Sequence, residues 1–383
     1  MIGDRKGLIS ILVPKSYNLN SLHILLIIHK YFNNMKHKLI IPGFLLLISL
    51  QLYCQKETNE PKGKVTGEFF GDYYYKLNGD TGALLKGPGQ YQQLAVKDQR
   101  FEIRRFNLGY EYAFNNIFSA RLMLEGNNGF TITTKETRGV YIKYAYLQWK
   151  NIFKGSDLIF GAQSTPTFAT FSEKIWSYRS VEKTIIDFHK QASSNDVGIS
   201  LSGKLYKNIS YYLMAGNGRS TSVENNNYKR FYGSVQGSIF DRKLLFQIYG
   251  DYERQSEITY NYILKGFLGY QRERYTIGFE PYTFVTTNDS LSKNKSALGI
   301  SLFARGSVIV QKLNAFYRID FYNDDLNSKS NYKETFMVFG IDYTPFTGID
   351  IIPNIWINGY NHEVSLVSRK ADIVARITFR YKI

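Results

Sequence analysis

The sequence has little of what a disulfide-rich secreted domain or a helical membrane protein needs. Its 383 residues include one cysteine, Cys54, which excludes a disulfide framework and any cysteine-rich metal site. The mean hydropathy is −0.28, whereas a helical membrane protein requires apolar runs of about 20 residues. Only His189 and His362 follow Cys54, and neither stands in a recognisable nucleophile or acid–base motif. We therefore predict no enzyme, no metal site and no cofactor.

Aromatic residues and basic residues are what the chain has in excess. Aromatics make up 16% of the sequence, with 31 Tyr and 27 Phe, although the chain as a whole is hydrophilic. This combination suits a transmembrane β-barrel, whose strands are apolar on one face only. The formal net charge is +16, but the basic residues are spread along predicted strands rather than gathered in runs. This distribution argues against nucleic acid as a partner.

The first 54 residues have the pattern of a secretory signal preceded by an additional segment. The basic stretch Met35–Lys38 is followed by an apolar region from Leu39 to Leu52 and by a polar start after Cys54. We expect cleavage after Cys54 or close by, with Met35 as the true start and residues 1–34 as an upstream segment. Cys54 could alternatively carry a lipid, but Tyr53 is bulky where a lipidation motif has a small residue. Residues 55–383 are predicted to form one domain.

Alternation of apolar and polar side chains recurs through the rest of the chain. In the last seven residues, Ile377, Phe379, Tyr381 and Ile383 share one face, a period that is typical of a strand. We predict sixteen such strands, each about long enough to cross a bilayer when tilted. They lie near 64–76, 100–114, 117–127, 138–150, 156–164, 195–206, 208–217, 229–240, 243–254, 259–271, 274–285, 296–306, 308–322, 333–344, 349–359 and 372–383.

The connections alternate between tight turns and longer loops. Outer-membrane barrels have short periplasmic turns and long outer loops, and an even number of strands puts both termini on the periplasmic side. We therefore predict a 16-stranded antiparallel transmembrane β-barrel. A ring of this size is too wide for side chains to fill, so it leaves an aqueous channel. The longest loop, 165–194, is the third outer loop.

Basic side chains on the polar faces are the candidate functional residues, because the charges at the narrowest point set the selectivity of a pore. The alternative is that these residues pair with acids across the strands and only solvate the wall. The predicted lumen-lining set is Arg105, Arg121, Lys143, Lys204, Arg318, Arg376 and Arg380. The predicted constriction set, from the third outer loop, is Lys174, Arg179, Lys183 and Lys190.

Five segments are informative by their order and spacing: Arg105–Tyr110, "VYIKYAYLQW" at 140–149, "FGAQSTPTF" at 160–168, "WSYRSVEKT" at 176–184 and "YYLMAGNG" at 211–218. Together they resemble the phosphate-selective porin O and P family and its general porin relatives in Gram-negative bacteria. The resemblance covers roughly residues 64–383. It implies a sixteen-strand barrel with an inward-folded third outer loop, assembled as a homotrimer that passes small anions by diffusion. In the phosphate-selective members this loop supplies several arginines, whereas here its basic residues are mixed with Glu173, Glu182 and Asp187.

The sequence therefore predicts a porin in the outer membrane of a Gram-negative bacterium. The expected partners are small hydrophilic solutes, inorganic anions such as phosphate among them, and the lipid of that membrane. A loop-plugged barrel that acts as an adhesin or scaffold without transport is the alternative. Solute flux distinguishes the two.

Overall fold

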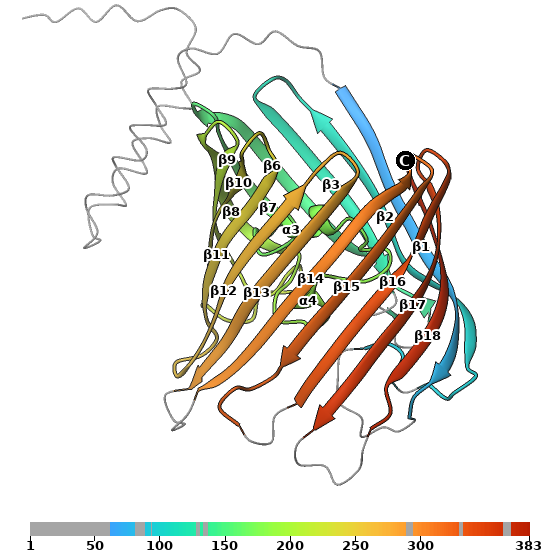
Figure 1. Cartoon of the computed structure of the whole chain (residues 1–383). Helices are drawn as coiled ribbons and strands as arrows, with labels where there is room; N and C mark the ends of the chain where they lie inside the picture. Colours follow the sequence, from blue (N-terminus) through green and yellow to red (C-terminus); the bar gives the residue numbers. More distant parts are fainter. Residues whose placement is uncertain are drawn as a thin grey trace, which may run out of the picture. The chain divides into compact units, whose positions relative to one another are not determined.

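A computed structural model describes residues 62–80, 89–92, 94–127, 131–132, 137–288, 294–328, 332–362 and 369–383. The predicted signal segment, Cys54 and the proposed start at Met35 lie outside these residues. The described chain forms one closed antiparallel barrel in which sixteen strands are paired in a ring (Figure 1). The predicted fold class is therefore confirmed.

The first eight strands of the ring are β1 (Lys62–Asn78), β2 (Gln99–Ala113), β3 (Phe118–Asn127), β6 (Tyr141–Phe153), β7 (Ser156–Ser164), β8 (Asn195–Tyr206), β9 (Ile209–Gly216) and β10 (Arg230–Ile239). The other eight are β11 (Leu244–Arg254), β12 (Thr259–Gln271), β13 (Tyr275–Asn288), β14 (Lys295–Ile309), β15 (Leu313–Asn323), β16 (Tyr332–Phe346), β17 (Ile349–His362) and β18 (Asp372–Lys382). Two short strands, β4 (Thr131–Ile132) and β5 (Thr137–Arg138), pair with each other outside the ring. The described residues form two helices, α3 (Ser172–Trp176) and α4 (Ile185–Phe188).

The strands present an apolar outer face and an inner face that carries the charged side chains together with buried apolar ones. In β15, Tyr317 and Phe321 are exposed on the outside of the ring, whereas Phe316, Arg318 and Asp320 are buried on the inside. Because no water is available in a hydrocarbon layer, charged side chains are stable only on the inner face of such a barrel.

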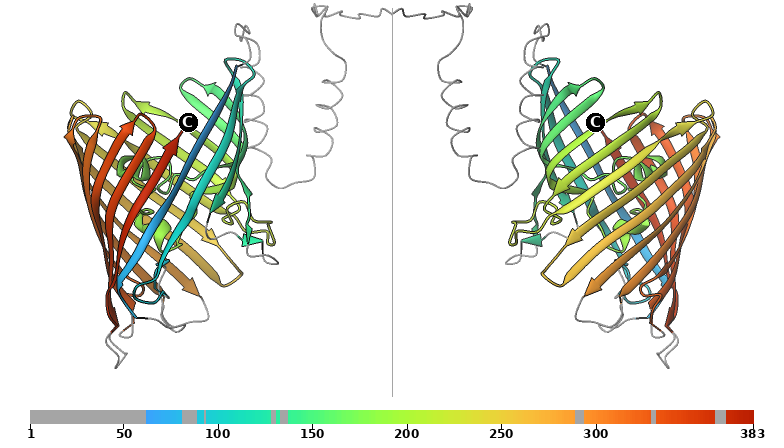
Figure 2. Two further views of the ribbon diagram at one scale, coloured as in Figure 1. Left: turned by 90° about the vertical axis from the view of Figure 1, so that its right-hand side faces the viewer. Right: turned by 90° about the vertical axis from the view of Figure 1, so that its left-hand side faces the viewer.

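The first and last strands close the ring. β1 pairs with β18 from Glu68 opposite Lys382 to Asn78 opposite Ile373, and on its other side with β2. The left view of Figure 2 shows the two strands next to each other. Closure removes the free strand edges whose unpaired N–H and C=O groups would be costly in lipid.

The connections differ at the two ends of the barrel. Short turns join β2 to β3 and then every second pair of strands, and the longer loops lie at the opposite end (Figure 1). The largest error in the predicted strand boundaries is at the β14–β15 turn: residues 308 and 309 belong to β14, and β15 begins only at Leu313. The run Val308–Val310 is apolar without alternation, so its side chains carry no information on where the turn falls. Among the described residues, no helix is long and apolar enough to cross a membrane.

Candidate functional site

The long connection between β7 and β8, residues 165–194, is bound to the wall by two apolar clusters. Trp176, at the end of α3, packs against Phe303 and Phe316, with ring centroids 5.2 and 6.1 Å apart. Ile185 and Ile186 of α4 are fully buried in a second cluster, with aromatic side chains from β9 to β13. Burial of this much apolar surface fixes both short helices to the inner face of the wall.

Cationic side chains of the wall also bind backbone carbonyls of this segment. The Arg104 guanidinium of β2 donates to the Val181 carbonyl at 3.2 Å, and that of Arg376 of β18 donates to the same carbonyl at 3.1 Å. Arg318 of β15 donates to the Lys183 carbonyl, and the Lys265 ammonium of β12 donates to the Ser172 hydroxyl at 2.8 Å.

A neutral side chain of the wall also donates a hydrogen bond to the segment. The Trp356 indole N–H of β17 donates to the Glu182 carboxylate at 2.9 Å. The strands that hold the segment therefore come from widely separated parts of the ring.

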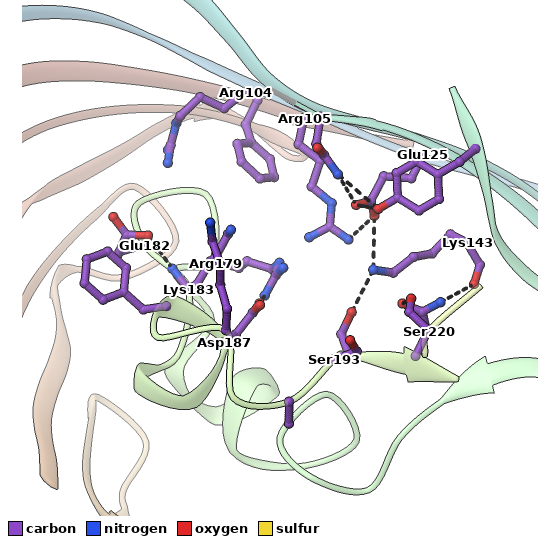
Figure 3. A pocket seen from close by; sticks show the side chains of 18 of the residues that line it. Arg104, Arg105, Glu125, Lys143, Arg179, Glu182, Lys183, Asp187, Ser193 and Ser220 are labelled. Carbon is purple, nitrogen blue, oxygen red and sulfur yellow. Dashed lines mark hydrogen bonds and ion pairs between the residues drawn. The ribbon is translucent and has the colours of Figure 1, made fainter. Parts of the chain in front are cut away.

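A cavity of about 470 Å³ lies between this segment and the wall formed by β1, β2, β3 and β6 (Figure 3). Six basic side chains and three acidic side chains line it, so their formal charges sum to +3. The remaining lining side chains are mostly small and polar. The charged lining residues are Arg104, Arg105, Lys143, Arg179, Lys183, Lys190, Glu125, Glu182 and Asp187.

Two β-bulges supply cations to this cavity. In the β1–β2 pair, Phe70 is opposite Arg105 and Gly71 is opposite Ile103, so Arg104 has no partner in the register. The extra residue allows Arg104 and Arg105, adjacent in sequence, to face the same side. In β6, Lys143 is likewise the extra residue, because Met123 is opposite Tyr144 and Leu124 is opposite Ile142.

Strict alternation assigns Arg104 to the lipid side together with Phe106, so the prediction from sequence missed it. The only signal was its charge, which is incompatible with that face. The guanidinium forms an ion pair with the buried carboxylate of Asp72, with a nitrogen–oxygen distance of 2.5 Å.

The charges in the cavity are partly neutralised by ion pairs. The Glu125 carboxylate is shared by Arg105 and by the Lys143 ammonium, the latter at 3.5 Å. The guanidinium of Arg179 bridges Glu173 and Asp187 within the loop segment.

The ion pair with Arg179 also affects the pKa of Asp187. Burial acts to raise the pKa of Asp187, but the charges of Arg179 and Lys183 and the hydrogen bond from Arg179 together leave that pKa below its usual value. Among the described residues, neither Lys183 nor Lys190 forms an ion pair, and both are exposed. These two ammonium groups are therefore the cationic groups most accessible to a solute.

The predicted constriction residues separate into two groups. Arg179, Lys183 and Lys190 line the cavity, whereas Lys174 of α3 is exposed and does not line it. Whether any of them sets the width of the pore remains a prediction.

The predicted lumen-lining residues also occupy different environments. Arg105 and Lys143 line the cavity. Arg318 and Arg376 are buried beneath the loop segment.

The last three members of the set lie elsewhere on the barrel. Arg121 is paired with Glu111 at 3.3 Å. Arg380 is paired with Asp350 at 2.9 Å. Lys204 lies near the short-turn end, beside Lys207 and Arg242.

The side chain of His189, in the loop segment, packs against the wall. His189 stacks on Tyr322, with ring centroids 3.5 Å apart, and its Nε2 lies 3.1 Å from a Glu334 carboxylate oxygen. In the described part of the chain, no group of three or more His, Cys, Asp or Glu side chains could hold a metal ion.

The barrel is similar to solved outer-membrane proteins of low sequence identity. A loop L8 deletion mutant of OmpT, an outer membrane protein of Vibrio cholerae, has a TM-score of 0.62 and 12% identity, covering 85% of this chain and 100% of that one. The outer membrane channel DcaP of Acinetobacter baumannii has a TM-score of 0.61 and 12% identity, covering 86% and 99%. An anion-selective porin from Comamonas acidovorans has a TM-score of 0.59 and 10% identity, covering 85% and 100%.

No family model matches the chain, and no curated protein does. At these identities the likeness establishes the fold, which this chain shares with outer-membrane porins and channels.

Proposed function

We propose that the protein is a porin of the Gram-negative outer membrane that lets small hydrophilic solutes diffuse across it. The observation that carries this proposal is the sidedness of the closed ring, whose outer face is apolar and aromatic and whose inner face is charged. Such a ring is stable only where lipid surrounds it and water or polar groups fill it. Secretion by the N-terminal signal and assembly as a homotrimer belong to the same proposal.

We further propose that the pore prefers anions. The cavity between segment 165–194 and the wall has a formal charge of +3 among its lining residues. An excess of positive charge along a narrow path raises the local concentration of anions and excludes cations. Inorganic phosphate is among the solutes expected to pass, in keeping with the resemblance to phosphate-selective porins. The ion-paired carboxylates of Glu125 and Asp187 favour a general anion preference over strict selectivity for phosphate.

The test replaces the two cavity lysines that form no ion pair. In the double variant Lys183→Gln with Lys190→Gln, the permeability ratio of chloride to potassium should fall several-fold, because two of the exposed positive charges on the path are lost. The measurement is the reversal potential across a planar bilayer in a potassium chloride gradient. Lys174→Gln is the matched control, since it removes an exposed lysine from the same segment outside the cavity and should leave the ratio unchanged.

The test has three informative outcomes besides the expected one. Equal effects of both variants would place the cavity away from the ion path. Preference of the unmodified protein for potassium would overturn the anion preference and leave the porin intact. Absence of any current would overturn the porin itself.

The packing of segment 165–194 favours one competing function, that of a plugged barrel used as an adhesin or scaffold. Trp176, Val181 and Phe188 form an apolar cluster with side chains of the wall, and this cluster occupies part of the interior. A plugged barrel would admit no solute. Liposomes containing the protein should swell in an isotonic sugar solution if the channel is open, and a failure to swell would support the plugged barrel.

A further inference from the structure

The short turns at one end of the barrel form a collar of positive charge. Of the seven turns, five carry Lys or Arg, and together the turns hold seven basic residues against two acidic ones, Asp241 and Glu273. Among the described residues, the one ion pair within these turns joins Lys243 to Asp241 at 3.9 Å. The six basic residues of these turns that take part in no ion pair with a described residue are Lys154, Lys207, Arg242, Arg272, Arg274 and Lys312.

Among the described residues, the opposite end of the barrel has no comparable bias. There, basic side chains of the long loops are matched by nearby acids, as in the pairs Lys229–Glu224 at 3.5 Å and Lys295–Asp324 at 3.3 Å. The excess of unpaired positive charge is therefore a feature of the short-turn end and not of the surface as a whole.

Exposed apolar side chains accompany the basic residues of the collar. Phe240, which is 73% exposed, is two residues from Arg242, and Tyr206, which is 61% exposed, is adjacent to Lys207. The Lys207 ammonium lies 5.3 Å from the centre of the Tyr206 ring. Aromatic side chains beside cations are typical of a membrane–water interface, where the ring meets the acyl chains and the cation meets the head group.

We propose that this collar binds the phosphate groups of anionic phospholipids, of the phosphatidylglycerol type, in the leaflet at the short-turn end. A leaflet that contains such lipids attracts clustered Lys and Arg side chains close to its surface. The exposed apolar residues favour a lipid over a soluble anionic polymer, because a polymer offers no hydrocarbon to cover them. This proposal rests on the proposed location of the barrel in a membrane.

The experiment compares two four-site variants of the full-length protein refolded in detergent. Each protein is mixed with equal amounts of phosphatidylglycerol and phosphatidylcholine, and the retained lipids are counted by native mass spectrometry. The collar variant is Lys207→Gln, Arg242→Gln, Arg272→Gln and Lys312→Gln. The control variant removes four charges from the opposite end: Lys97→Gln, Arg219→Gln, Lys229→Gln and Lys295→Gln.

The unmodified protein and the control variant should retain phosphatidylglycerol preferentially, and the preference should shrink as salt is added. In the collar variant, the preference for phosphatidylglycerol over phosphatidylcholine should be about tenfold smaller. Equal retention of the two lipids by the unmodified protein, or an equal loss in both variants, would overturn the proposal. So would collar-dependent co-sedimentation with peptidoglycan in the absence of any lipid preference, which would assign the collar to a cell-wall polymer.

Conductance in planar bilayers tests the proposed porin function independently of the proposed lipid binding. The collar variant should conduct like the unmodified protein. A conducting protein without lipid preference refutes the collar alone, whereas a protein that retains phosphatidylglycerol but does not conduct refutes the porin alone.

Discussion

At the scale of single residues, burial separates the cations that hold the loop segment from those that meet solvent. Arg104 shows the first role, because its guanidinium joins the buried Asp72 carboxylate to the Val181 carbonyl. Lys183 and Lys190 show the second role, since both are exposed in the cavity. A count of inward-facing basic residues therefore overstates the charge that a solute meets.

Arg104→Gln should destabilise the folded barrel by about 3 kcal/mol, because it leaves a buried carboxylate with a weakened set of partners. The free energy of unfolding is measured by urea titration of the protein in lipid vesicles, followed by tryptophan fluorescence. Arg105→Gln is the control and should cost less, because Glu125 keeps the Lys143 ammonium at 3.5 Å. Adding Asp72→Asn to Arg104→Gln should restore part of the loss, and no such recovery would rule out the ion pair as the cause.

The ion pair between Arg179 and Asp187 predicts a pH dependence of the loop segment. Because the pKa of Asp187 is lowered in the folded protein, its contribution is present above the unfolded value of about 3.9 and is lost as the pH falls through the folded value. Single-channel current noise should thus stay constant from about pH 7 to pH 5 and rise only below about pH 4. In Asp187→Asn the noise should be high throughout this range. A rise near pH 6 in the unmodified protein would point to a different titrating group.

At the scale of elements, the strands were predictable and the packing of the loop segment was not. Period-two alternation locates a strand because one face meets lipid and the other faces the interior of the barrel. Each of the sixteen ring strands was predicted from this pattern. The bulges at Arg104 and Lys143 interrupt that alternation, and the only local sign of them in the sequence is the charge of these two side chains. Trp176 packs on Phe303, and Val181 accepts a hydrogen bond from Arg376; both partners are more than 100 residues away, which a reading of local patterns does not reach.

Trp176→Ala should loosen the loop segment while the barrel stays folded. The indole packs on Phe303 and Phe316 of the wall, and loss of a buried tryptophan costs about 3–5 kcal/mol. Single-channel recordings should show larger and noisier currents, with an unchanged β-sheet signal by circular dichroism. Trp149→Ala is the matched control, since this indole packs on Phe118 at the short-turn end of β6. Currents that are the same in both variants would mean that the segment does not limit the flow.

At the scale of the whole molecule, the fold depends on pairing the two ends of the described chain in one register. Tyr73 of β1 is opposite Ile377 of β18, and a shift by a single residue would turn the apolar face of the last strand inward. A disulfide can test this register because the α-carbons of directly opposed residues are about 4.5–5.5 Å apart, whereas diagonal neighbours are farther apart. In a Cys54→Ser background, Tyr73→Cys with Ile377→Cys should cross-link on mild oxidation of the folded protein. The cross-linked form should migrate differently from the reduced form on a denaturing gel. Tyr73→Cys with Phe379→Cys, displaced by two residues on the same face, should stay reduced, and preferential cross-linking of this second pair would show that the barrel closes in another register.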